Sequence, residues 1–141
     1  MSANVWVAPA SSANLNLSIL SPVETSRGKH FAWATNAKHI HKYAKIQVGD
    51  IVLFGNSKTG YKWFAEVTEK PTDVDIEWPY PSPSGEPWSN VFFVNETTEL
   101  ATPVTCADIR GIRGTDGLPQ TQYMLTNSQA SDMLKLMASH M

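Results

Sequence analysis

Residues 48–68 read VGDIVLFGNSKTGYKWFAEVT, and they contain two apolar runs separated by a short polar segment. The first run, 51–54, is continuously apolar and lies between Gly49 and Gly55, which is typical of a buried strand. Residues 55–60 are rich in turn-forming types, and 61–68 return to strand character. We therefore predict a β-hairpin in the middle of the chain.

Short strand-like and helix-like segments lie on both sides of this hairpin. We expect strands over 5–8, 31–35, 91–94 and 123–125, helices over 36–45, 105–109 and 126–137, and a helical turn or two over 15–20. Asn36 is expected to cap the second helix. No internal repeat is visible, so residues 1–141 are interpreted as one domain. The predicted fold class is α+β, with a curved or barrel-like mixed β-sheet flanked by about three helices.

Residues 71–90 have a different composition. Five of the nine prolines fall in this stretch, together with Trp78, Tyr80 and Trp88. Because proline has a fixed φ and no N–H to donate, the stretch is expected to be neither a helix nor a central strand. It is predicted to be a long, stiffened loop that carries aromatic side chains, and such loops are often functional.

The overall composition narrows the class of protein. The single cysteine, Cys106, excludes an intramolecular disulfide and a cysteine-based zinc site, and it fits a reducing compartment. No apolar run approaches the roughly 20 residues that span a bilayer. Residues 1–10 lack a basic start followed by an apolar stretch, so no secretory signal is expected. The sequence predicts a cytoplasmic protein without a membrane partner.

Positive charge is concentrated in one segment although the net charge is −2. Residues 27–45 hold five of the eleven lysines and arginines and no acid. These are Arg27, Lys29, Lys38, Lys42 and Lys45, accompanied by His30, His39 and His41. Such a segment gives one surface a local positive potential. A phosphate-binding face and a merely solvated helix face are both open at this point.

The sequence offers no converging set of reactive groups. His39 and His41 lack further metal ligands at matching spacing, and Cys106 is interpreted as a small core residue. Asp73 and Asp75 lie in the proline-rich loop without a partner base. We therefore expect no catalytic residue, no metal site and no cofactor.

The five tryptophans are unusual for 141 residues. Trp6 and Trp63 lie in strand-like runs, where burial explains them. Trp33 ends a predicted strand beside the basic segment, and Trp78 and Trp88 lie in the proline-rich loop. An indole face can hold a flat base, which contributes roughly 1–3 kcal/mol per stacked base. Packing beneath the loop is the structural alternative for Trp33 and Trp78.

Several short motifs occur in an order that resembles a known family. They are AWAT at 32–35, VGDIV at 48–52, YKWFAEV at 61–67, NVFFV at 90–94 and PVT at 103–105. They follow an opening strand at 5–7 and a Ser/Asn loop at 11–14. This order resembles the YTH/EVE group within the PUA-like superfold, over roughly residues 5–137.

The resemblance implies a site for an extruded, modified base. Its two tryptophan walls would be Trp33 and Trp78, with Trp88 as a third wall or as a residue that closes the loop. Groups that read the base edge would come from Ala34, Thr35, Ser12 and Asn14. Flanking phosphates would contact Lys29, Lys38, Lys42, Lys45, Arg110 and Arg113.

The expected function is therefore a non-catalytic reader of a modified base, with N6-methyladenine and 5-substituted cytosines both open. Relatives in this group often serve as specificity domains of modification-dependent restriction systems, including McrB-type GTPases. The resemblance thus favours DNA over RNA as the partner, with a GTPase or nuclease fused to or associated with the chain. Alternatives are a free-standing reader of N6-methyladenine in RNA, an enzyme that uses His30 and the helix histidines, and a protein-interaction module built on residues 71–90.

Overall fold

The strands form one curled, mixed sheet. The computed structural model describes residues 4–78, 85, 88–114 and 123–141. Within these residues, β1 and β4 pair in parallel and the other pairs are antiparallel. Strand β7 (Thr98–Val104) pairs with β5 outside the main path. The main order is β2 (Val23–Thr25), β3 (Gly28–Asn36), β6 (Trp88–Val94), β5 (Gly60–Glu69), β4 (Ile51–Asn56), β1 (Val5–Pro9) and β8 (Tyr123–Met124).

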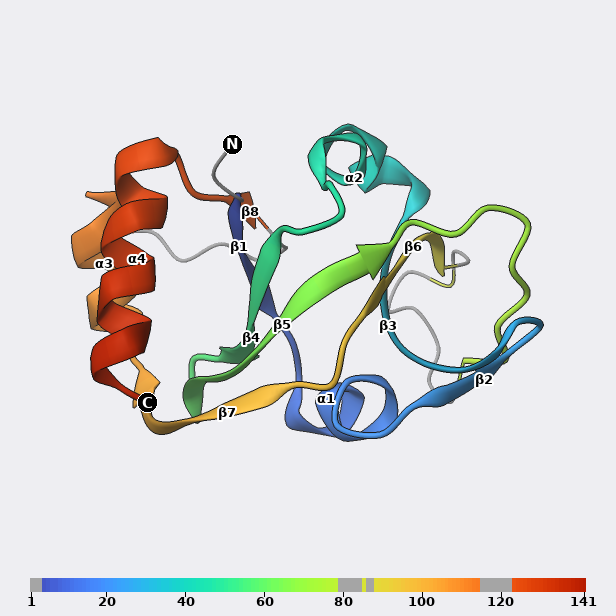
Figure 1. Ribbon diagram of the computed structural model, residues 1–141, viewed down its shortest axis with the longest axis horizontal. Coiled ribbons are helices and arrows are strands. Elements are labelled where there is room, and N and C mark those ends of the chain that lie inside the picture. Colours follow the sequence, from blue (N-terminus) through green and yellow to red (C-terminus); the bar gives the residue numbers. More distant parts are fainter. Residues whose placement is uncertain (1–3, 79–84, 86–87, 115–122) are drawn as a thin grey trace.

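The described part of the chain also contains four α-helices. They are α1 (Ser12–Ser18), α2 (Ile40–Lys45), α3 (Cys106–Arg113) and α4 (Asn127–Ser139). In Figure 1, α3 and α4 cover one end of the sheet, whereas the β2–β3 hairpin extends at the opposite end. Helices α1 and α2 lie on opposite sides of the strands in the same view. The predicted α+β class with a curved mixed sheet is confirmed, with four helices in place of about three.

The predicted central hairpin is confirmed as β4 and β5. Its register shifts between Phe54 and Gly55, where the two strands approach closely. A Cβ atom on Gly55 would lie 2.3 Å from the Gly60 carbonyl oxygen and from the Tyr61 Cα atom. Only glycine fits this approach, which lets the hairpin bend and the sheet curl.

Successive side chains of each strand point to opposite faces of the sheet, and the buried apolar residues therefore form three separate clusters. The α4 core contains Val5 and Val7 with Met133 and Met137. Trp6 and Ala8 point to the other face of the sheet and belong to a second cluster, which we call the α1 core. Its further buried side chains include Leu15, Ile19, Trp33, Val52, Phe54 and Phe92. The third group, which we call the loop cluster, consists of Val23, Ala32, Ala34, Val91 and Phe93, with Val74, Ile76, Trp78 and Trp88 packed against it. The period of two in each strand produces this division.

A buried carboxylate ties the start of the chain to the central hairpin. Asp50 is 2% exposed, and its Oδ2 accepts hydrogen bonds from Trp6 Nε1 at 3.0 Å and from the Gln47 backbone N–H at 2.9 Å. Its Oδ1 accepts from the Asn4 backbone N–H at 3.2 Å. Three donors, two from residues 4–6 and one from Gln47, thus satisfy one carboxylate, as a buried charge requires.

Several predicted boundaries were wrong. A 3₁₀ turn (Ala37–His39) follows β3, so α2 begins at Ile40 with His39 as its N-cap residue in place of Asn36. Strand β3 begins at Gly28 and not at Phe31, because its first residues pair with β2. Strand β2 has only three residues, which is too short for a recognisable strand pattern in the sequence. Trp88 begins β6 and does not lie in the loop. The predicted loop residues 79–84 and 86–87 lie outside the described part.

Candidate nucleic-acid interface

Trp33 and Trp78 lie in different apolar clusters. Trp33 is 7% exposed and belongs to the α1 core, where its ring meets Phe54 edge-on at a centroid distance of 5.6 Å. Trp78 packs against the loop cluster. The structure therefore does not bring these two rings together as the walls of one slot.

The reason is the alternation of side chains along β3. Trp33 pairs with Phe92 and points with it into the α1 core, whereas Ala34 pairs with Val91 and points into the loop cluster. Adjacent residues of a strand face opposite sides of the sheet, so the sheet separates Trp33 from Trp78. Ala34, Trp78 and Trp88, in contrast, share the loop cluster.

A groove lies beside α2, and we call it the α2 groove; among the predicted base-binding residues, Trp88 lines it, whereas Ala34 and Trp78 do not. Its volume is about 620 Å³, within the usual range for sites that hold small ligands. Helix α2 contributes Ile40 and Tyr43, the loop after β5 contributes residues 71–75, and β6 contributes residues 88–91. Trp88 is the tryptophan among these lining residues. The groove therefore combines two aromatic rings with polar side chains.

A buried polar pair lies at the β6 side of the groove. Asn90, which lines the groove, is 4% exposed, and its Nδ2 donates to Thr35 Oγ1 at 3.2 Å. Thr35, predicted as an edge-reading residue, does not line the groove itself but is hydrogen-bonded to Asn90, which does. Tyr43 is anchored to the same strand, because its hydroxyl donates to the Val91 carbonyl oxygen at 2.7 Å. The bond from Tyr43 holds α2 against β6.

Lys70 fixes the other side of Tyr43. Its Nζ donates to the Tyr43 carbonyl oxygen at 3.0 Å and lies 4.4 Å from the centroid of the Tyr43 ring. Burial lowers the pKa of Lys70, and the nearby Asp50 charge opposes that effect. Burial also raises the pKa of the Tyr43 hydroxyl, so this group remains a neutral donor at physiological pH.

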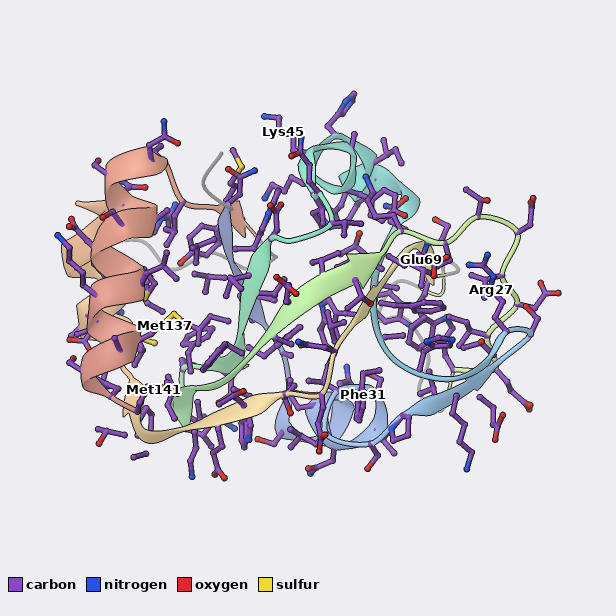
Figure 2. All side chains as sticks on the ribbon, viewed as in Figure 1. Arg27, Phe31, Lys45, Glu69, Met137 and Met141 are labelled. Carbon is purple, nitrogen blue, oxygen red and sulfur yellow. The ribbon has the colours of Figure 1, made fainter. Side chains whose placement is uncertain are left out.

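Three of the predicted phosphate-binding lysines lie on or just before α2. Lys38 and Lys45 are exposed and Lys42 is half-buried. The described residues provide no ion-pair partner for any of the three. Figure 2 shows Lys45 beside α2, far from Met137 on α4. We call Lys38, Lys42 and Lys45 the α2 rim, because Lys42 and Lys45 lie on the helix that lines the groove and Lys38 lies in the turn just before it.

The other predicted phosphate contacts are elsewhere. Lys29 forms an exposed ion pair with Glu24 at 3.7 Å on the β2–β3 hairpin. Arg110 and Arg113 lie on α3 beside α4, away from α2 (Figure 1), and the Arg113 guanidinium lies 4.3 Å from the centroid of the Tyr123 ring. Arg27, beside Glu69 in Figure 2, forms an ion pair that links the hairpin to the end of β5.

The predicted edge-reading residues of the Ser/Asn loop are also separate from the groove. Ser12 and Asn14 belong to α1, which is capped by the Ser11 hydroxyl, and α1 lies on the opposite side of the strands from α2 (Figure 1). Ser12 Oγ accepts from Asn56 Nδ2 at 3.4 Å. The structure thus joins Ser12 to the turn of the central hairpin and not to Trp78.

None of the described histidines lines the groove. His30 stacks on Phe93 with ring centroids 4.2 Å apart. Within the described residues, no group of three or more His, Cys, Asp or Glu side chains is arranged to hold a metal ion. None of the described helices combines the length and apolar character of a membrane span.

Sequence reasoning missed Tyr43 and Asn90 and gave Asp73 and Asp75 no role. All four line the α2 groove. The signal for Tyr43 was its place between Lys42 and Lys45 in the basic segment, which puts an aromatic ring next to a cationic rim. No local pattern marks Asn90, because its importance comes from its pairing with Thr35, 55 residues away.

Comparison with known proteins identifies the fold. No family model matches the chain, and no curated protein matches it either. Among solved structures, the Mmi1 YTH domain in complex with RNA has a TM-score of 0.64 and 10% identity, covering 97% of this chain and 79% of that one. ASCH from Zymomonas mobilis has a TM-score of 0.58 and 10% identity, covering 94% of each chain.

A hypothetical protein from Leishmania major is a third similar structure, with a TM-score of 0.59 and 18% identity. The alignment covers 98% of this chain and 96% of that protein. The likeness therefore extends over nearly the whole chain, and the sequence-based resemblance to a PUA-like fold is confirmed at the level of architecture. The chain has the curled mixed-sheet fold that is also found in YTH and ASCH domains.

Proposed function

We propose that this chain is a non-catalytic nucleic-acid-binding domain that holds one modified base in the α2 groove while the α2 rim binds the flanking phosphates. The observation that carries the proposal is the place of the groove beside the rim: Tyr43 lines the groove between Lys42 and Lys45 on the same helix. An aromatic groove next to unpaired lysines matches a base attached to a phosphate chain.

The size and composition of the groove support a single extruded base. A volume of about 620 Å³ is sufficient for one nucleotide, and Trp88 and Tyr43 offer aromatic surface for stacking. Asp73 and Asp75 offer hydrogen-bond acceptors for a base edge. An extruded base that loses its stacking in a strand regains it against such side chains.

The proposal contains no catalytic step. His30, the histidine expected to act in the enzyme alternative, stacks on Phe93 of the loop cluster and does not line the groove. The proposal extends to DNA as the partner, with the chain as the specificity module of a modification-dependent restriction system. That extension rests on the sequence resemblance, and matched DNA and RNA strands test it.

Replacing Trp88 by alanine is expected to weaken binding of a strand with one modified base by about tenfold or more, because a stacked base contributes roughly 1–3 kcal/mol. Fluorescence anisotropy at fixed salt measures the loss. Trp88→Phe, which keeps a flat ring, should retain most of the affinity, and thermal unfolding checks that both variants are folded. An unchanged affinity in a folded Trp88→Ala variant would remove the groove from the proposal.

A further inference from the structure

The loop after β5 contributes two carboxylates to the lining of the α2 groove. Asp73 and Asp75 are exposed and line the groove from the loop after β5. The described residues provide no hydrogen-bond or ion-pair partner for either carboxylate. Both groups are therefore available to a ligand in the groove.

This loop is held in place by the β2–β3 hairpin. The Asp75 backbone N–H donates to Ser26 Oγ at 2.9 Å, and the Ser26 N–H donates to the Asp75 carbonyl oxygen at 2.8 Å. Ile76 forms an isolated β-bridge with Thr25. The backbone that carries Asp75 is therefore held in place before a ligand binds, which lowers the entropic cost of binding.

The aromatic wall also favours positive charge. Tyr43 and Trp88 both line the groove, and aromatic faces attract cations. The Tyr43 ring already lies 4.4 Å from the Lys70 ammonium. Lys70 does not line the groove and forms no described ion pair with Asp73 or Asp75. A groove lined by both carboxylates and aromatic rings is expected to bind a flat cation better than a flat neutral ring.

Methylation can give a nucleobase such a charge. A methyl group on an exocyclic amine or on C5 of cytosine leaves the base neutral, whereas a methyl group on N1 of adenine or N3 of cytosine produces a cation at neutral pH. The cationic base also keeps an exocyclic nitrogen that donates a hydrogen bond, which a carboxylate accepts. We propose that the α2 groove selects a base that is alkylated on a ring nitrogen and positively charged.

This inference rests on the proposed function and names the substrate class of the same site. A cationic base within a phosphate chain carries both signs of charge. The α2 rim presents lysines to the phosphates, and the wall with Asp73 and Asp75 presents carboxylates to the base. The same wall repels an approaching phosphate, so it disfavours a strand that lies in the groove without extruding a base.

Isomeric bases provide the test because they differ in charge and not in composition. Strands with 1-methyladenine or N6-methyladenine form one pair, and strands with 3-methylcytosine or 5-methylcytosine form the other. We expect the cationic isomer of each pair to bind about tenfold more tightly, as measured by fluorescence anisotropy at fixed salt. The isosteric double variant Asp73→Asn and Asp75→Asn should remove this preference, so that the two isomers of each pair bind alike.

Four other outcomes would overturn the inference, and each has a different consequence for the proposed function. Preference for a neutral isomer over both its cationic partner and the unmodified base would leave the proposed function intact and remove the charge selection. Equal affinity for all strands would remove both proposals. Persistence of the preference in the folded double variant would exclude the two carboxylates as its source. Binding of a trimethyllysine peptide without any preference among the strands would assign the groove to a protein partner.

Discussion

Reversal of the α2 rim, by Lys38→Glu, Lys42→Glu and Lys45→Glu together, is expected to weaken nucleic-acid binding about 100-fold or more at low salt. The loss should affect modified and unmodified strands alike, because phosphate contacts carry no information about the base. The slope of log affinity against log salt should become shallower by about 0.9 for each duplex phosphate contact that is lost. Titrations at several salt concentrations measure both quantities.

A matched variant separates this effect from net charge. Lys58→Glu, Arg110→Glu and Lys135→Glu together change the charge by the same amount at exposed positions on the central hairpin turn, α3 and α4. This variant should bind far more tightly than the rim variant and keep most of the salt slope. Equal losses in both variants would mean that binding depends on overall charge and not on the α2 rim.

Replacing Asp50 by alanine is expected to lower the free energy of unfolding by about 3 kcal/mol or more. The change leaves Trp6 Nε1 and the backbone N–H groups of Asn4 and Gln47 without their acceptor in a buried position. For a chain of this size the midpoint of thermal unfolding should fall by roughly 10 °C. Denaturant titration and calorimetry measure the two quantities.

Glu66→Ala provides the control for Asp50→Ala. Glu66 is an exposed carboxylate in β5, opposite Ile51 in the neighbouring strand, and its substitution should change stability by less than about 0.5 kcal/mol. A loss below about 1 kcal/mol for Asp50→Ala would contradict the view that this carboxylate joins β1 to the central hairpin.

The sequence predicts those parts of the fold that local patterns determine. The apolar run 51–54, the turn residues after it and the return at 61–68 specify the central hairpin without long-range information. The helix predicted over 105–109 likewise has the correct start, because Thr105 is the N-cap residue of α3. The helix continues to Arg113, however, and ends at Gly114, which adopts the left-handed conformation. The predicted end of this helix, at residue 109, was therefore too early.

The candidate site was harder to predict because it depends on which way side chains face. Trp33 was recognised as unusual, but only the register of β3 with β6 shows that it points into the α1 core. Ala34, one residue later, points toward Trp78 and Trp88. The α2 groove likewise depends on the phase of a six-residue helix and on a loop pinned by Ser26. Neither feature follows from the composition of its own segment.

The measurement that tests the central claim most directly is a titration of the unaltered protein at one fixed salt concentration. Matched strands of DNA and of RNA would be unmodified or carry one N6-methyladenine, 1-methyladenine, 5-methylcytosine or 3-methylcytosine. The account predicts that at least one modified strand binds about tenfold more tightly than its unmodified counterpart, and that Trp88→Ala removes the difference. Equal affinity for every strand, or no binding to any, would contradict the claim that this domain reads a modified base.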